Sequence, residues 1–351
     1  MTKQLLRSAI ASCCRAAGIL ALAERRNRPK LTILCYHRIL PADRKAAYPL
    51  SHLAVTPETF KAHCAVLSSH YEVLALNDAV AAMNASRTAT KPLAAITFDD
   101  GYRDNLEYAA PILDDAGLKA TFFIVAGLVG EDRSPWYDEM IRAASALHER
   151  QRLGAMLAST PLVGTGGHAL TPKDVLEQAK TLAPEKRAAL LETLRREAGD
   201  TKTPDPLDVI MDWDDLRQLA ASGHEIGSHT LTHELLPLLD DTALKTEISE
   251  SRTLLNRQLD EPIPSFCFPN GDYDDRALRE VQAAGYTSAV TTASGNNAPG
   301  ADPHRLSRWD IDEERLAGAT GKPSATLLRL ELSQLADRVF LRDRARRNQA
   351  S

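Results

Sequence analysis

An apolar run that stops at two adjacent carboxylates, within residues 94–101, constrains the fold of this chain more than any other stretch. Residues 94–98 are short, apolar and partly β-branched, which predicts a buried strand. Inside a regular strand, Asp99 and Asp100 would point to opposite faces, and one carboxylate would enter the core without a partner. Gly101 allows the backbone to leave the pleat, so we expect both carboxylates at the strand's end, where α/β folds carry their chemistry. Taken alone, the three residues are also compatible with an ordinary acidic turn.

Predicted strands and helices alternate along most of the chain, which indicates a parallel α/β sheet or barrel. The helices are expected from apolar residues at helical spacing, as in the stretch that Thr56 and Pro57 open. With 351 residues and 44% hydrophobic content, the chain can fill one large domain with insertions or two modest domains. The predicted strands are residues 31–36, 71–76, 94–98, 120–126, 224–229, 265–268, 286–291 and 305–311.

A charged, helix-prone region at about residues 130–210 interrupts this alternation. Its two segments with helical periodicity, residues 137–157 and 172–198, predict an α-helical insertion. We expect the insertion to form a lid or wall on a barrel domain that spans residues 31–320. A separate helical hairpin that binds a partner is the alternative.

The two ends of the chain are basic. Residues 1–30 predict an amphipathic helix that lies on a membrane surface or on the protein itself, with a signal peptide or anchor as the alternative. Residues 321–351 predict an arginine-rich helix and tail, which forms either a solvated face or a membrane or partner contact. No run of about 20 apolar residues predicts a membrane span. We therefore expect a cytoplasmic protein with peripheral contact to the inner membrane surface, and export is the alternative. The apolar face of the N-terminal helix is expected to carry Leu6, Ile10, Cys13, Ala17 and Leu20.

Charge and cysteine content argue against several other classes of protein. A net charge of −5 and a pI near 6.1 give no reason to expect a nucleic-acid partner. The five cysteines form no CxxC pair and no zinc-ribbon spacing, so we expect neither a disulfide framework nor a zinc site of that type. Cys35 and Cys267 lie in apolar runs, where a free thiol is usually a small buried hydrophobe. This cysteine usage favours a reducing compartment.

A pair of histidines four residues apart, His229 and His233, follows another predicted strand. This spacing places both imidazoles on one side of a helical turn or tight loop, which suits two nitrogen ligands on one metal. Zinc bound by two histidines and a carboxylate, with an open position for water, is a recurrent catalytic arrangement. With Asp99 and Asp100 at a second strand end, the sequence predicts that one aspartate is the third ligand and the other accepts a proton from water.

Three motifs occur in order along the chain: Thr97-Phe98-Asp99-Asp100-Gly101, His229-Thr230-Leu231-Thr232-His233 and Phe268-Pro269-Asn270-Gly271. Together they resemble the polysaccharide deacetylases of carbohydrate esterase family four, over roughly residues 31–130 and 211–311. The resemblance implies a distorted (β/α) barrel of about seven units. It also implies metal-dependent hydrolysis of an N-acetyl group on a sugar.

Roles follow from the resemblance by motif position. It implies that Asp99 is the catalytic base and that a divalent metal, usually zinc, binds three ligands. The Pro269-Asn270-Gly271 turn is implied to stabilise the oxyanion through the backbone amide of Asn270. The implied metal ligands are Asp100, His229 and His233.

Two positions depart from the family pattern. Cys267 stands where family members often carry the arginine that orients the base, and we expect Arg308, or else Arg38, to replace it. The general-acid histidine also has no clear counterpart. His304 lies near the expected place in the chain, whereas His37 reaches the same end of the predicted sheet from the first strand. The segment that contains His37 resembles the exopolysaccharide-associated branch of the family.

The expected function is that of a metal-dependent hydrolase that removes N-acetyl groups from N-acetylhexosamine residues of a polysaccharide or glycolipid precursor. An amidase or O-deacetylase that acts on a smaller substrate is the alternative within enzymes. A non-catalytic glycan-binding module on the same fold is the alternative outside them.

Overall fold

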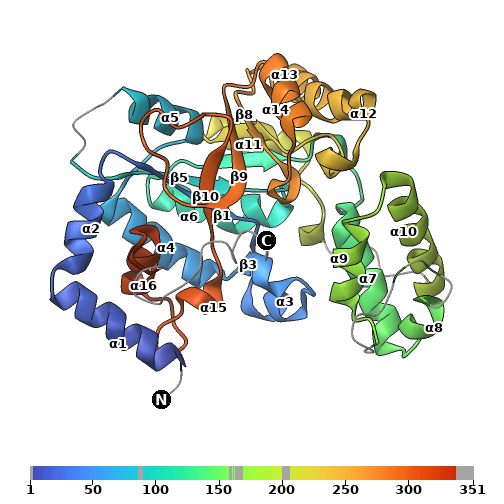
Figure 1. Cartoon of the computed structure of the whole chain (residues 1–351), viewed down its shortest axis with the longest axis horizontal. Coiled ribbons are helices and arrows are strands. Elements are labelled where there is room, and N and C mark those ends of the chain that lie inside the picture. Colours follow the sequence, from blue (N-terminus) through green and yellow to red (C-terminus); the bar gives the residue numbers. More distant parts are fainter. Residues whose placement is uncertain are drawn as a thin grey trace.

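Seven parallel strands close a barrel in the computed structural model, which describes residues 3–85, 90–157, 160, 162, 169–199 and 206–336. The predicted (β/α) barrel is therefore confirmed (Figure 1). Strand β5 pairs back with β1 and so completes the circle. In order around the barrel the strands are β1 (Leu31–Tyr36), β10 (Leu306–Asp310), β9 (Ser288–Ser294), β8 (Ser265–Cys267), β7 (Glu225–Ser228), β6 (Thr121–Ile124) and β5 (Leu93–Phe98).

Strand β4 (Glu72–Val73) is shorter than the predicted strand at residues 71–76. It pairs with the first residues of β5, where Glu72 lies opposite Leu93. The last residues of β5 instead pair with β6 on the same edge. Because β6 occupies that edge, β4 cannot extend along it, and the chain turns at once into the helix that begins at Leu76.

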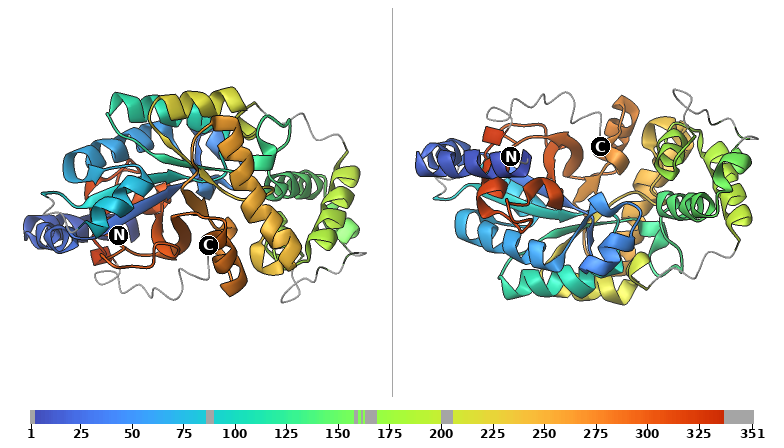
Figure 2. Two further views of the ribbon diagram at one scale, coloured as in Figure 1. Left: turned by 90° about the horizontal axis from the view of Figure 1, so that it is seen from above. Right: turned by 90° about the horizontal axis from the view of Figure 1, so that it is seen from below.

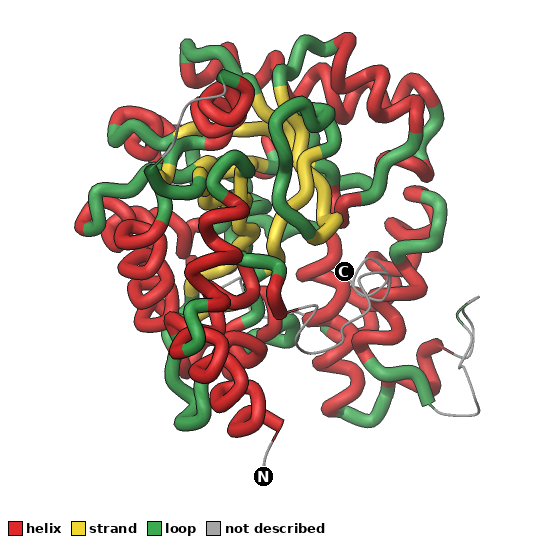
Figure 3. Tube along the Cα trace, turned by 60° about the vertical axis from the view of Figure 1, so that its left-hand side comes forward, coloured by secondary structure: helices red, strands yellow, loops and turns green. Residues whose placement is uncertain are grey.

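Helices surround the strands on the outside of the barrel (Figures 2 and 3). The first of these is α4 (Pro57–His70), and the Thr56 hydroxyl accepts a hydrogen bond from the Thr59 amide, as expected of an N-cap. The predicted helix at residues 238–259 is continuous in space but includes a π-helical turn, η6 (Thr246–Glu250), between α12 (Asp241–Lys245) and α13 (Ser251–Leu259). The others around the barrel are α5 (Leu76–Asn84), η2 (Asn105–Ala109), α6 (Ala110–Asp115), α11 (Trp213–Ala221) and α14 (Asp275–Ala283).

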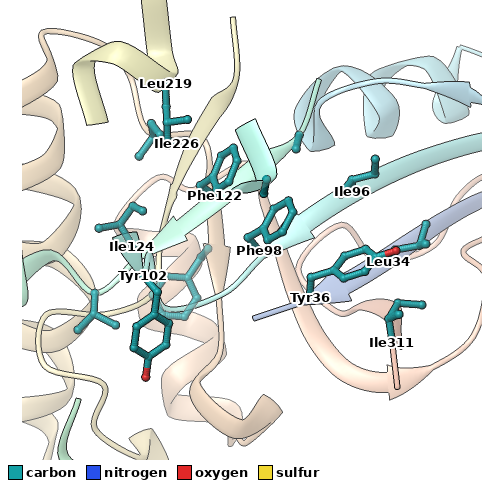
Figure 4. Close-up of a cluster of buried hydrophobic side chains, with 14 of the residues drawn as sticks. Leu34, Tyr36, Ile96, Phe98, Tyr102, Phe122, Ile124, Leu219, Ile226 and Ile311 are labelled. Atoms are coloured by element: carbon teal, nitrogen blue, oxygen red, sulfur yellow. The ribbon is translucent and has the colours of Figure 1, made fainter. Parts of the chain in front are cut away.

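The strands are apolar on both faces because both faces are buried. The outer face packs against the helices, and the rings of Phe98 and Phe122 stack there with centroids 4.9 Å apart (Figure 4). Alternate residues such as Ile33 and Ala95 fill the interior together with Phe123. Side chains two positions further along each strand therefore point into the barrel at its C-terminal end.

His63 on α4 makes stability depend on pH. Its Nδ1 atom lies 3.0 Å from the Tyr36 hydroxyl, and burial lowers the pKa of His63 to about 4. The folded state therefore favours neutral His63, so this stability is complete above pH 6.5 and is lost as the pH falls towards 4. We expect a loss of roughly 3 kcal/mol over that range. In urea titrations, His63→Gln should lack this component, and an unchanged pH dependence would contradict the assignment.

The N-terminal segment forms two helices, α1 (Lys3–Ala16) and α2 (Ile19–Asn27), rather than the single helix expected. Gly18, with φ of 71°, separates them. Both pack against α16 (Ala325–Leu332) near the C-terminal end of the described chain. Within the described residues no single helix is long and apolar enough to cross a membrane, and α1 with α2 meets that criterion only as a pair bent by 77°.

The packed face of these two helices also differs from the expected one. Of the expected face, Leu20 is buried and Ile10 is half-buried, whereas Leu6, Cys13 and Ala17 are exposed. Ala11 and Cys14, which the expected face did not include, are buried. Helical periodicity thus identified an apolar face that the protein itself covers only in part, at Leu20 and Ile10. The arginine-rich run of the predicted C-terminal tail, beyond residue 336, lies outside the described residues.

The predicted insertion consists of α7 (Trp136–Glu149), α8 (Leu153–Leu157), α9 (Pro172–Ala179) and α10 (Pro184–Ala198), beside the barrel in Figure 1. These helices enclose an apolar cluster of their own. The same cluster includes Tyr48 and Leu50, from the segment that follows β2 (Arg38–Ile39). The insertion is thus packed onto the barrel domain through a shared core.

Candidate active site

Tight turns place the predicted site residues at the C-terminal ends of the strands. Asp99 and Asp100 directly follow β5, and Asp100 has a φ of 73° and Gly101 a φ of 85°. The positive φ of Gly101 disfavours a side chain, and a Cβ atom there would also lie 2.7 Å from the Ile124 Cδ1 atom, so this turn favours glycine. His233 ends a second tight loop after β7 and has a φ of 63°. Both turns bring polar side chains out of the strands and to the same end of the barrel.

Three of these side chains form a cluster with the donor set of a zinc site. The Nε2 atoms of His229 and His233 lie 3.5 and 3.4 Å from the Asp100 Oδ1 atom, and all three residues are buried. The Nδ1–H of His229 donates to the Cys267 carbonyl at 2.8 Å, which leaves the Nε2 lone pair directed at the cluster. The Asp100 Oδ2 atom is buried without a hydrogen-bond partner. The residues therefore fit a divalent cation, because an ion there would bind the lone pairs of this oxygen and of the two imidazole nitrogens.

Asp99 is held by a buried arginine. The Nη1 and Nη2 atoms of Arg308 donate to the two Asp99 carboxylate oxygens at 2.6 and 2.7 Å. Burial raises the pKa of Asp99, but the Arg308 guanidinium outweighs burial and holds that pKa well below its ordinary value. Asp99 is consequently ionised at neutral pH and is available as a proton acceptor.

Arg308, rather than Arg38, occupies the place expected for the orienting arginine. Arg308 lies on β10 with the parity of the interior residue Leu306, so its side chain points into the barrel. Arg38 points away, and it forms ion pairs with Asp104 at 2.8 Å and Asp208 at 2.7 Å. The two-residue period of a strand thus explains why the side chain of Arg308, and not that of Arg38, points into the barrel.

Two buried thiols that the sequence reasoning treated as ordinary core also contact Asp99. The Sγ atoms of Cys35 and Cys267 lie 3.5 and 3.4 Å from the Asp99 Oδ2 atom. Burial raises the pKa of both thiols well above the ordinary value, so they stay neutral and can donate to the carboxylate. Arg308 Nη2 lies 3.3 Å from the Cys267 Sγ atom, so the small Cys267 side chain leaves room for the guanidinium.

The structure separates the two candidate general acids. The Nε2 atom of His37 lies 3.9 Å from Asp99 Oδ2, and its side chain is 21% exposed. His304 is far from this cluster, and its Nε2 atom contacts the Tyr286 carbonyl at 2.9 Å. The expectation for His304 is wrong because it precedes β10 and so lies at the opposite, N-terminal end of the parallel barrel.

A cavity of about 410 Å³ opens over the cluster. Its lining includes His37, Asp99 and Asn270 from the barrel, and Trp136 and Lys173 from the insertion. The volume is in the range of small-ligand sites. The insertion therefore forms a wall of the cavity that contains the candidate catalytic residues.

The turn at Pro269-Asn270-Gly271 contributes the rim of the cavity. It forms η7 (Pro269–Gly271), and Asn270 adopts a left-handed conformation with φ of 56°. Gly271 has a φ of 74°, and a Cβ there would lie 2.1 Å from Thr292 Oγ1. This turn therefore favours the asparagine and glycine that the motif carries at positions 270 and 271.

Tyr137 on α7 is a site residue that no sequence motif indicated. Its ring centroid lies 4.9 Å from that of His233, and its hydroxyl lies 2.8 Å from the Tyr102 hydroxyl. Burial raises the pKa of Asp100, whereas His37, His229 and, to a smaller extent, the Tyr137 hydroxyl lower it. Tyr137 thus links the insertion to the cluster.

Tyr137→Phe should weaken metal affinity about tenfold, because outer-shell partners of a ligand typically have effects of that size. The variant loses the hydroxyl that favours ionised Asp100. Competition with a fluorescent zinc chelator measures the affinity. Tyr48→Phe is the matched control, since the Tyr48 hydroxyl donates to Asp138 at 2.8 Å. It belongs to the same network but is joined to Tyr137 only through Asp138 and Tyr102. Equal affinities of the two variants would contradict the link.

Comparison with known proteins gives the same family. Residues 86–289 match the family model described as polysaccharide deacetylase. The YxkH protein of Bacillus subtilis (strain 168) is 22% identical over 267 residues, which cover 76% of this chain and 66% of that protein. The chain therefore spans just under two thirds of that relative's length.

Solved structures share the fold at low sequence identity. The Streptococcus pyogenes deacetylase PplD, in complex with acetate, is 19% identical with a TM-score of 0.56, and the match covers 86% of this chain and 98% of that one. IcaB from Ammonifex degensii is 16% identical with a TM-score of 0.55, and the match covers 87% and 97% of the two chains. At these identities the likeness shows the fold alone.

Proposed function

Because the chain belongs to the polysaccharide deacetylase family, we propose that it removes N-acetyl groups from N-acetylhexosamine residues of a polysaccharide or glycolipid precursor. The proposed cofactor is a divalent metal, and the two histidines and one carboxylate of the cluster favour zinc. The observation that carries this proposal is the cluster of Asp100, His229 and His233 beside the Asp99–Arg308 pair. A single cavity contains both. When bound by the cluster, the cation supplies Lewis-acid activation of water and of the amide carbonyl.

The residues of the chain then divide the proton transfers between them. Asp99 accepts a proton from the attacking water, since Arg308 keeps it ionised and fixed. The backbone amide of Asn270, at the cavity rim, donates to the oxygen that becomes negative when the carbonyl is attacked. His37 donates a proton to the amine as the carbon–nitrogen bond breaks. The products are acetate and the free amino sugar.

His37→Asn tests the assignment of the general acid. Release of acetate from an N-acetylated sugar should slow by about 10² to 10⁴. Hydrolysis of p-nitrophenyl acetate should change little, because a phenolate leaves without a proton. His52→Asn is the matched control, since His52 lines the same cavity. Equal slowing with both substrates would indicate a structural role for His37 instead.

The substrate class is tested with a panel of acetylated compounds. N-acetylglucosamine oligomers, O-acetylated sugars and small N-acetyl amides are incubated with the zinc-loaded protein, and acetate is measured. We expect the highest kcat/KM with the N-acetylated oligomers. A preference for O-acetyl groups or small amides would favour the alternative enzyme, and no acetate from any compound would oppose the proposal.

A further inference from the structure

The two N-terminal helices carry most of the large apolar side chains that the described protein exposes. Leu6 is 47% exposed, Ile19 47% and Leu22 53%. Four of the five exposed large hydrophobic residues in the described chain lie on α1 and α2, and the fifth is Leu238 at 38%. Such a concentration of exposed apolar surface marks an interaction site. The exposed apolar residues of α1 and α2 are Leu5, Leu6, Ala9, Cys13, Ala16, Ile19, Ala21 and Leu22.

These residues form continuous faces on their helices. On α1, Leu6, Ala9 and Cys13 are separated by three and four positions, so they lie on one side of the helix. On α2, Ile19 and Leu22 are separated by three positions. Each of the two helices therefore carries an exposed apolar face, and the two faces together are called the apolar stripe.

The charge around this stripe is positive. The exposed charged side chains of α2 and its end are arginines, among them Arg25 and Arg26, which lie three and four positions after Leu22. Arg15 is also exposed at the end of α1. The first acidic residue of the chain is Glu24, and it forms an ion pair with Arg329 at 2.7 Å. The surface is therefore basic although the whole chain has a net charge of −5.

The opposite face of the two helices is attached to the body of the protein. Ala11, Cys14 and Leu20 pack against α16 in one apolar cluster. The Asn27 side-chain amide donates to the Ser333 carbonyl at 3.1 Å. The attachment fixes the stripe on the outside, and α1 and α2 lie across the molecule from α8 and α10 (Figures 1 and 2).

We propose that α1 and α2 are a docking surface for an anionic lipid bilayer, in the plane of the interface. An apolar stripe with arginines beside it matches the acyl boundary and the anionic headgroups of such a surface. The charged side chains that are exposed on the described parts of α1 and α2 are arginines, and they favour a negatively charged surface over a neutral one. The proposal concerns a surface remote from the catalytic cluster and is independent of the proposed reaction.

Vesicle flotation of the full-length protein tests this docking surface. The protein should float with vesicles that contain phosphatidylglycerol, and much less with pure phosphatidylcholine or in high salt. Leu6→Glu combined with Leu22→Glu should reduce the bound-to-free ratio by at least about tenfold, since it adds negative charge and removes apolar area. Arg25→Gln combined with Arg26→Gln should reduce it by roughly tenfold. Leu238→Glu, the same type of change at an exposed leucine elsewhere, should leave flotation unchanged.

Thermal melts and acetate release from a soluble oligosaccharide accompany each variant. Both should be unchanged, because the altered side chains are exposed and lie outside the cavity. The proposal is overturned if the wild-type protein does not float with anionic vesicles, or if Leu238→Glu reduces flotation as much as the N-terminal variants. It is also overturned if the N-terminal variants abolish a dimer while vesicle binding stays the same. If the wild-type protein releases no acetate from the oligosaccharide, that result opposes the proposed reaction but not the docking surface.

Discussion

Asp99→Asn should slow acetate release by about 10² to 10⁴ while metal affinity stays near that of the wild-type protein. Asparagine has the shape of aspartate but cannot accept the proton of the attacking water. The three side chains that fit the metal are other residues, so zinc should still bind. Acetate release and zinc content are measured on the same preparation. Glu177→Gln, which removes a carboxylate from the cavity wall on α9, should retain the wild-type rate.

Two outcomes would contradict the role of Asp99. Undiminished acetate release would show that Asp99 does not accept the proton. Loss of zinc together with activity would show that Asp99 is a ligand rather than a base. Because the change also leaves Arg308 opposite a neutral group, the unfolding free energy must be measured alongside, so that a loss of rate is compared only among folded proteins.

Arg308→Met should both destabilise the protein and reduce its activity. The variant leaves the buried Asp99 carboxylate without its cation, and breaking a buried pair in this way typically costs about 3 to 5 kcal/mol. Arg308 lowers the pKa of Asp99, so its removal allows burial to raise that pKa. Protonated Asp99 needs no cation, and the stability deficit of the variant should therefore shrink as the pH falls. Urea denaturation at several pH values measures this.

The double variant Asp99→Asn with Arg308→Met separates stability from catalysis. It should recover part of the stability lost in Arg308→Met, since no unpaired charge remains, but it should recover no acetate release. Additive effects on the unfolding free energy would show that the two side chains do not interact as the 2.6 and 2.7 Å contacts indicate.

The barrel and four residues of the candidate site were predictable because each motif follows a predicted strand. A polar pair after a buried strand has only one place to go in a parallel barrel, and Asp99, Asp100, His229 and His233 meet there. The position of Arg308 also follows from the two-residue period of its strand. His304 was misplaced because it was compared by distance along the chain, although residues before a parallel strand lie at the opposite end of the barrel.

Other features depend on contacts between distant segments. Tyr137 comes from an insertion without a motif, and its approach to Asp100 and His233 depends on how α7 packs. Cys35 and Cys267 looked like ordinary core residues, and only the closed barrel brings their thiols to Asp99. In the N-terminal helices, periodicity revealed an apolar face but could not tell whether the protein covers it. The packing of Ala11 and Cys14 on α16 decides that question.

Zinc-dependent release of acetate from an N-acetylglucosamine oligomer tests the proposed function most directly. The purified protein is stripped with a chelator, zinc is added back in steps, and acetate and bound zinc are measured together. We expect no acetate from the stripped protein and a rate that rises with zinc until about one ion is bound per chain. His233→Ala should require far more zinc. Full activity without metal, or no acetate from the zinc-loaded wild-type protein, would contradict the assignment of this site.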